Sequence, residues 1–133
     1  MYRYNSYHKI ITVLIVLCWA IFHFSNRSKE SDIQYDNGQV VTSGNKENAL
    51  KEGLWKWYYE DGSVSMQGYF SKGKRTGIWQ TFSRNGTLQT ESIYENNLLN
   101  GTYKKYDSLG NIIEEIEYRN DTIVSRTPKV LGR

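Results

Sequence analysis

The sequence repeats itself with a period of 24 residues. A shift of 24 aligns two independent series of glycines, Gly53, Gly77 and Gly101, and Gly62, Gly86 and Gly110. Two glycine series in one phase are hard to obtain by chance, and a period of this length is typical of repeat proteins built from one small unit per period. The chain therefore has to fold by stacking similar units side by side.

Each period contains two strand signals on either side of a turn signal. The same shift of 24 aligns two aromatic series, Trp55, Trp79 and Tyr103, and Tyr58, Phe82 and Tyr106. These aromatic segments precede the glycine turns, and alternating segments such as Val64–Phe70 follow them. Mostly polar residues stand between the alternating ones, which predicts one buried face and one solvent-exposed face. Two short strands joined by a glycine turn predict a β-hairpin. A lone hairpin is marginally stable, so neighbouring hairpins must pair edge to edge.

The predicted fold is all-β, an extended antiparallel meander of tandem 24-residue β-hairpin repeats preceded by one N-terminal hydrophobic helix. We expect an N-terminal segment at 1–28, a linker or degenerate entry repeat at 29–52, and repeats at 53–76, 77–100 and 101–124. The entry repeat is suggested by Tyr35 and Gly38, which lie 24 residues before Tyr59 and Gly62. Residues 125–133 are expected to be a disordered tail. Because Trp55 and Tyr58 are three residues apart, they lie on opposite faces of their strand unless a bulge intervenes. The sequence leaves that choice open.

The N-terminal segment has a basic start followed by the apolar run of residues 10–22. This pattern fits either a signal anchor that spans the membrane or a cleavable signal peptide. Bulky residues, Trp19 and Phe22 among them, stand where a cleavage site would need small ones, which favours the anchor. The charge balance slightly favours an N-terminus inside, with the repeats outside the cytoplasm. Secretion after cleavage, a lipid anchor on Cys18 and a buried core helix are the alternatives.

Composition excludes most catalytic and nucleic-acid-binding classes. Both histidines, His8 and His23, precede the repeats, and Cys18 is the single cysteine. The repeats therefore lack the commonest general base, and no cysteine zinc site or intrachain disulfide can form. Residues 53–124 carry eight Lys or Arg against nine Asp or Glu, so a basic face for nucleic acid is not expected. We predict no enzyme activity, no cofactor and no metal.

Three groups of side chains in the repeats are candidate sites, each with a structural alternative. The carboxylates Glu114, Glu115, Glu117 and Asp121 suggest an acid pair or a cation site, although a solvated strand edge is the favoured interpretation. The basic turn of Lys72, Lys74 and Arg75 suggests contact with acidic lipid, or a plain exposed turn. The aromatic residues Trp55, Trp57, Trp79 and Tyr103 suggest a carbohydrate or peptide groove, or a core ladder, which is favoured.

The segments Gly53-Leu-Trp-Lys-Trp-Tyr-Tyr-Glu-Asp-Gly62 and Gly101-Thr-Tyr-Lys-Lys-Tyr106 resemble the bacterial MORN variant repeat, as does the stretch from Gly68 to Trp79. The resemblance covers three repeats and implies a β-hairpin array for protein or membrane contacts without catalysis of its own. Some bacterial members are labelled YwqK-type antitoxins. The third repeat departs from the pattern at Asn120-Asp121-Thr122, as a C-terminal cap would.

Two functions follow as hypotheses. The first is a membrane-anchored, non-catalytic module that binds an unknown protein partner, with lipid as a further possible contact. The second is an antitoxin or immunity protein of a toxin–antitoxin pair.

Overall fold

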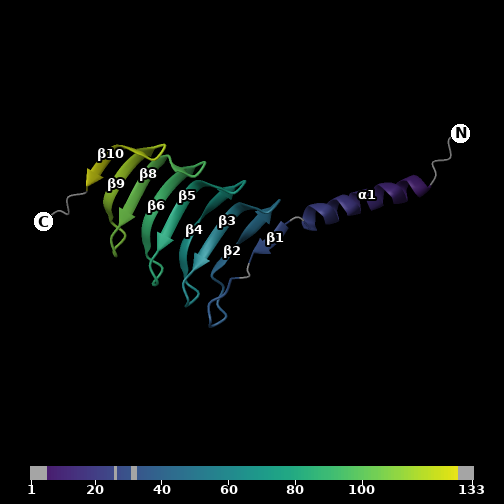
Figure 1. Ribbon diagram of the computed structural model, residues 1–133, viewed down its shortest axis with the longest axis horizontal. Helices are drawn as coiled ribbons and strands as arrows, with labels where there is room; N and C mark the ends of the chain where they lie inside the picture. The colour runs from purple at the N-terminus through teal and green to yellow at the C-terminus, as the bar shows by residue number, and fades with distance from the viewer. Residues whose placement is uncertain (1–5, 26, 31–32, 129–133) are drawn as a thin grey trace.

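The computed structural model describes residues 6–25, 27–30 and 33–128, which form one helix and ten antiparallel strands (Figure 1). The elements are α1 (Ser6–Ser25), β1 (Arg27–Glu30), β2 (Thr42–Glu47), β3 (Leu50–Tyr58), β4 (Val64–Ser71), β5 (Lys74–Phe82), β6 (Leu88–Glu95), β7 (Leu98–Leu99), β8 (Gly101–Tyr106), β9 (Ile112–Arg119) and β10 (Thr122–Pro128). The predicted all-β meander of hairpin repeats is confirmed.

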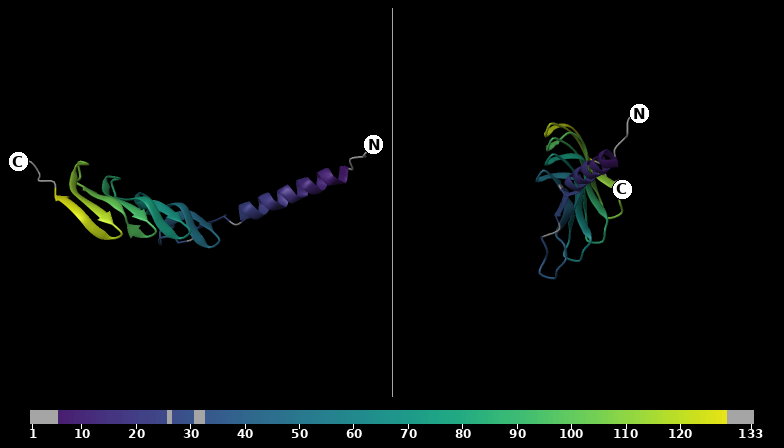
Figure 2. Two further views of the ribbon diagram at one scale, coloured as in Figure 1. Left: turned by 90° about the horizontal axis from the view of Figure 1, so that it is seen from above. Right: turned by 90° about the vertical axis from the view of Figure 1, so that its right-hand side faces the viewer.

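The strands form a single twisted sheet in which spatial order follows chain order. That order is β1-β2-β3-β4-β5-β6-β8-β9-β10, with β7 pairing to β6. Figure 2 shows that the sheet is one layer thick and that α1 extends away from its β1 end. A sheet normally buries one face against a second layer of structure. Because this sheet has no second layer, side chains of the sheet itself have to cover its apolar face.

The turn glycines give each hairpin its tight turn. In the second hairpin, Gly62 has a φ of 85° and donates its N–H to the Tyr59 carbonyl at 2.9 Å. Asp61 accepts the N–H of Ser63 at 2.9 Å. Positive φ is cheap for glycine and costly for other residues. The same backbone contacts recur around the glycines at 38, 86 and 110, each with a φ of 82° or 83°.

The strand glycines sit in a β-bulge. Gly68 pairs with Trp79 and Tyr69 with Thr76, so Gly77 and Ile78 are extra residues on β5. Gly77 has a φ of 64°, and Gly53 and Gly101 also have positive φ at the matching places. The bulge explains why the series of Gly53, Gly77 and Gly101 recurs in the sequence.

A ladder of aromatic rings packs on one face, here called the aromatic face, which carries Trp55, Trp57, Phe70, Trp79 and Tyr94. Trp55 is 1% exposed and Trp79 6%. The Trp79 ring centroid lies 5.1 Å from that of Phe70 and 5.5 Å from that of Trp57. Burial of large aromatic rings supplies most of the hydrophobic stabilisation available to a single layer.

Each buried tryptophan lies over a glycine of the preceding strand. A Cβ on Gly44 would lie 2.2 Å from Cδ2 of Trp55, and a Cβ on Gly68 would lie 2.2 Å from Cδ2 of Trp79. The two indole N–H groups donate to the carbonyls of Asn45 (3.1 Å) and Tyr69 (3.2 Å). Because Gly44 and Gly68 differ by 24, the segment before residue 53 follows the same pattern as the repeats.

Residue alternation along the strands answers the question that the sequence left open. Trp55 and Trp57 lie on the aromatic face, whereas Tyr58 lies on the other, where its hydroxyl is 2.9 Å from the Ser43 hydroxyl. The nearby register shift is on β4, since Met66 pairs with Trp57 but Val64 pairs with Tyr58. Val64 therefore leaves the face of Met66, and the predicted alternation from Val64 onward was wrong at this position.

The C-terminal tail differs from the expectation of disorder. Residues 125–128 belong to β10, and Arg126 of this strand pairs with Ile116 of β9. The prediction of disorder was therefore wrong for 125–128, because Thr122–Thr127 has strand-forming residues and an edge to pair with. Residues 129–133 lie outside the described residues.

The N-terminal helix forms as predicted, from Ser6 to Ser25, and meets the sheet at β1. No helix among the described residues is long and apolar enough to cross a membrane. The prediction of a membrane-spanning anchor is therefore not supported.

Candidate binding face

The face opposite the aromatic ladder, here called the open face, carries an apolar row across four strands. The row consists of Leu54, Tyr69, Ile78 and Ile93, on β3, β4, β5 and β6. Their exposed fractions are 39%, 49%, 49% and 36%. Leu54 pairs with Tyr69 and Ile78 with Ile93, while the β-bulge shifts the register between Tyr69 and Ile78, so that Tyr69 pairs with Thr76. Partly exposed apolar side chains in one line mark a surface suited to a partner.

A polar row runs beside the apolar row on the same face. It consists of Lys56, Gln67, Gln80 and Glu91, which are cross-strand neighbours in that order. Gln67 Nε2 donates to Gln80 Oε1, and Gln80 Nε2 donates to Glu91 Oε2, both at 2.9 Å. This ladder holds the amide groups in place, which reduces the entropy that a partner would have to remove on binding.

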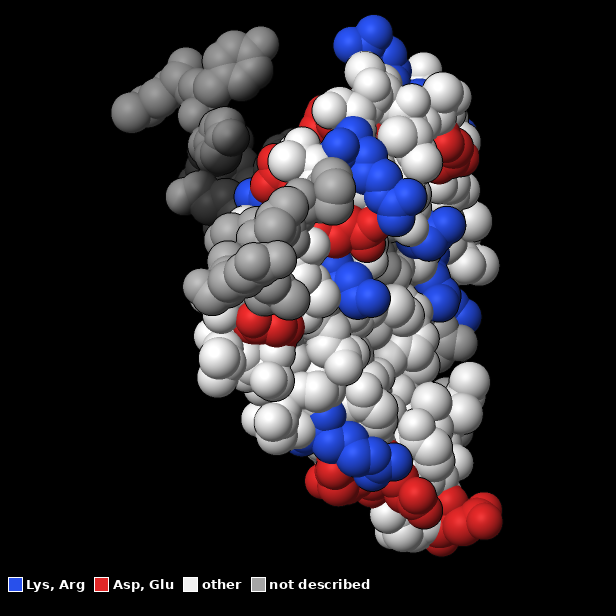
Figure 3. All heavy atoms as spheres, turned by 90° about the vertical axis from the view of Figure 1, so that its left-hand side faces the viewer, with Lys and Arg blue, Asp and Glu red and all other residues white. Residues whose placement is uncertain are grey.

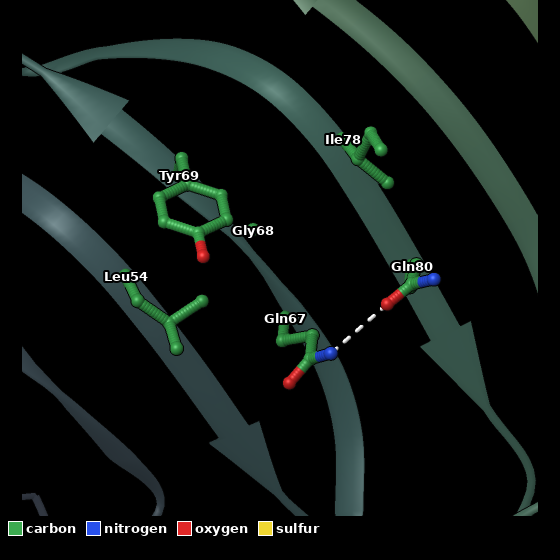
Figure 4. A pocket seen from close by; sticks show the side chains of 6 residues that line it. All are labelled: Leu54, Gln67, Gly68, Tyr69, Ile78 and Gln80. Atoms are coloured by element: carbon green, nitrogen blue, oxygen red, sulfur yellow. Dashed lines mark hydrogen bonds between the residues drawn. The ribbon is translucent and has the colours of Figure 1, made fainter.

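A shallow hollow lies between the two rows, as Figure 4 shows. Its volume is about 200 Å³, and it is lined by Leu54, Gln67, Gly68, Tyr69, Ile78 and Gln80. The Tyr69 ring and the Leu54 and Ile78 side chains stand around its apolar part. A partner side chain of aliphatic size fits such a hollow.

Basic side chains cover rings of the aromatic face. The Lys51 ammonium lies 4.2 Å from the Trp55 ring centroid, and the Arg75 guanidinium lies 4.2 Å from the Tyr94 ring centroid. Lys51 and Arg75 are 24 residues apart, so the cation–π contact repeats with the hairpins. With Trp55 and Trp79 buried, these aromatics form a core, and the structure does not support a groove for carbohydrate or peptide.

Burial on the aromatic face extends to Tyr103, the third member of the tryptophan series. Burial raises the pKa of the Tyr103 hydroxyl, and the neighbouring Glu114 and Tyr118 raise it further. The raised pKa keeps this hydroxyl neutral. Tyr103 thus continues the ladder into the third repeat.

The structure separates the candidate carboxylates. Glu114 forms an ion pair with Arg126, Glu117 accepts a hydrogen bond from the Thr102 hydroxyl at 2.9 Å, and Asp121 accepts one from the Leu99 N–H at 2.6 Å. Among the described residues no three His, Cys, Asp or Glu side chains are grouped as metal ligands. These carboxylates hold strands and turns together and do not form an acid pair.

The basic turn is also divided. Lys72 and Lys74 line a polar hollow of about 370 Å³ together with Glu95, while Arg75 lies on the aromatic face. Seen from the β10 end in Figure 3, basic and acidic side chains are interspersed. Arg75 therefore does not join the two lysines in one basic patch.

Sequence reasoning missed the apolar row because it assigned the positions between the aromatic residues to a wet face. The signal was available: Leu54 and Ile78 are 24 residues apart, as are Tyr69 and Ile93. A periodic apolar series on the second face indicates a second buried or bound surface.

The contacts between hairpins repeat with the same period. The Tyr35 hydroxyl donates to the Tyr58 carbonyl at 2.9 Å, and the Tyr59 hydroxyl donates to the Phe82 carbonyl at 2.7 Å. A family model described as MORN repeat variant matches residues 51–72, 75–96 and 99–120. The chain belongs to the MORN repeat variant family. No curated protein and no solved structure matches it.

The three matched MORN units correspond to hairpins of the sheet. They cover β3–β4, β5–β6 and β7–β9, and each ends at the first residue of the two-residue turn that leads to the next strand. MORN repeats are generally non-catalytic modules for protein or lipid interaction. In this MORN protein the open face carries the partly exposed apolar row.

Proposed function

We propose that this MORN protein binds a partner protein through its open face. The observation that supports the proposal is the row of four partly exposed apolar side chains, Leu54, Tyr69, Ile78 and Ile93. Burial of such a row contributes on the order of 25 cal/mol per Å² of apolar area removed from water. The ordered Gln67–Gln80–Glu91 ladder beside it supplies hydrogen-bonding groups that give a protein partner its orientation.

Site-specific photo-crosslinking in cells tests this proposal. A photoreactive phenylalanine replaces Ile78 on the open face, and the matched control places it at Lys105, an exposed position on the aromatic face. We expect covalent protein adducts from position 78 and few from position 105. Adducts with lipid alone, or no adducts at 78, would refute protein binding by this face.

The antitoxin role that the resemblance implies stays a prediction, as does the location of the repeats relative to the cytoplasm. The antitoxin role is tested by deleting the gene of this protein while an adjacent toxic gene is retained, and by comparing the growth of these cells with that of cells that keep both genes. Fractionation with protease protection of a C-terminally tagged chain tests the location of the repeats, because it reports both the size of the product and the accessibility of the tag.

A further inference from the structure

The open face carries charge and shape that match its own rotated image. We propose that the partner on this face is a second copy of the chain, packed sheet against sheet about a twofold axis parallel to the strands between β4 and β5. This inference rests on the proposed function, since it names the partner of the same face. Two sheets packed in this way lie about 10 Å apart.

The rotation brings like rows together. It places β4 against β5 of the second copy and β3 against β6. Leu54 then faces Ile93 of the second copy, and Tyr69 faces Ile78 of the second copy. The whole apolar row meets an apolar row, and both hollows receive an aliphatic side chain from across the axis.

The same rotation pairs opposite charges. Lys56 faces Glu91 of the second copy, and Glu91 faces Lys56 of the second copy, while Gln67 faces Gln80; Lys104, the next cross-strand neighbour of Glu91, faces Ser43 of the second copy, the cross-strand neighbour of Lys56. Because the interface is isologous, each contact occurs twice. Lys56 and Glu91 of the two copies thus form two intermolecular ion pairs.

Lys56 and Glu91 can each accept a further ion-pair partner. No carboxylate of the described residues lies within ion-pairing distance of Lys56. Gln80 uses Oε2 of Glu91, and no group among the described residues donates to Oε1. Lys104 is the cross-strand neighbour of Glu91 on this face, but it does not lie within ion-pairing distance of the carboxylate. The existing hydrogen bond also holds the Glu91 carboxylate in position for its second partner.

Two other twofold arrangements match less well. A twofold axis perpendicular to the strands along the polar row would place Lys56 against Lys56 and Glu91 against Glu91. An axis between the rows would place apolar side chains against charges. Facing like charges, or charges set against apolar side chains, disfavour both of these arrangements relative to the parallel axis.

Charge exchange in the full chain tests the proposal. Sedimentation equilibrium measures the dimer dissociation constant of the native chain, Lys56→Glu, Glu91→Lys and the double exchange. We expect each single variant to weaken the dimer at least tenfold and the double exchange to return it to within about threefold. The control, Glu60→Lys, reverses a charge in an exposed turn outside both rows and should leave the constant unchanged.

Disulfide trapping provides a second measurement that does not depend on charge. In a Cys18→Ser background, Lys56→Cys and Glu91→Cys are combined. Positions 56 and 91 of one chain lie three strands apart, about 14 Å at 4.8 Å per strand, which is too far for a disulfide. Mild oxidation should therefore give covalent dimers of the double variant and none of either single variant.

A monomeric native chain, or single variants that match the Glu60→Lys control without rescue by the double exchange, would overturn self-pairing. So would association that persists in all variants, which would point to α1 as its source. If the chain is monomeric but position 78 still captures another protein, the proposed function stands and the self-pairing fails. If neither dimer nor adduct is found, both fail.

Discussion

Because Trp79 packs directly on Gly68, adding one methyl group at Gly68 should lower the free energy of unfolding substantially. In Gly68→Ala the new Cβ would lie 2.2 Å from Cδ2 of Trp79, whereas ordinary contacts begin near 3.4 Å. The indole therefore has to move by more than 1 Å. It is 6% exposed and enclosed by Phe70, Trp57 and Tyr94, with ring centroids 5.1, 5.5 and 5.9 Å away.

The cost follows from what this movement disrupts. Overpacking a well-filled core costs about 1–3 kcal/mol. The hydrogen bond from the indole N–H to the Tyr69 carbonyl is worth about 1 kcal/mol. Alanine recovers about 0.4–1 kcal/mol by restricting the unfolded chain. We expect a net loss of about 2–3 kcal/mol in the free energy of unfolding.

Urea unfolding followed by tryptophan fluorescence and circular dichroism measures this loss. The chain supplies its own control at Ser92, the position equivalent to Gly68 in the next repeat, where Tyr103 replaces the tryptophan. Ser92→Ala should change the free energy of unfolding by less than about 0.5 kcal/mol, as substitutions without a named mechanism usually do. A Gly68→Ala loss as small as that of the control would refute the reasoning.

Three further predictions concern the repeat contacts, acid stability and the helix. Tyr59→Phe removes the hydrogen bond to the Phe82 carbonyl and should cost about 1 kcal/mol in urea unfolding; no loss would show that this bond between repeats is not stabilising. Hydrogen bonds from the Asn111 side chain and backbone, with others from Leu109 and Gly110, lower the pKa of Asp107, so its contribution is complete above the ordinary carboxyl range near pH 4 and is lost as pH falls through the folded-state pKa. Thermal unfolding from about pH 6 to pH 2 should therefore decline less steeply for Asp107→Asn than for the native chain, and equal slopes would contradict it. Removal of residues 1–25 should leave the thermal midpoint of the sheet nearly unchanged, because the contact of α1 with the sheet is small and lies mainly at β1; a drop of many degrees would show that the helix packs on a face.

The repeat architecture was predictable because each unit is local. Glycines with positive φ and buried aromatic rings recur every 24 residues, and a local turn needs no information from distant parts of the chain. The hairpins, the strand order and the aromatic core therefore followed from sequence. The degenerate segment before residue 53 was detectable for the same reason, through Tyr35 and Gly38.

The open face was harder to predict because β-bulges change which side chains share a face. The shift between Val64 and Met66, and the extra residues Gly77 and Ile78, break the simple alternation from which faces are assigned. Lys74 and Arg75 lie on opposite faces for a simpler reason, because they are adjacent residues of one strand. The carboxylates could not be assigned from sequence because their partners, such as Arg126 for Glu114, come from another strand.

The agreement between chain order and strand order also bears on how such a protein changes in length. Loss or gain of one 24-residue unit would join strands with matching register, so the remaining pairs would keep their partners. Neighbouring strands are rotated by roughly 20–25°, and each hairpin therefore adds about 40–50° between the two ends of the sheet. The number of repeats would thus determine the angle between α1 and the β10 edge. Chains with different numbers of repeats would therefore present the same face in different directions.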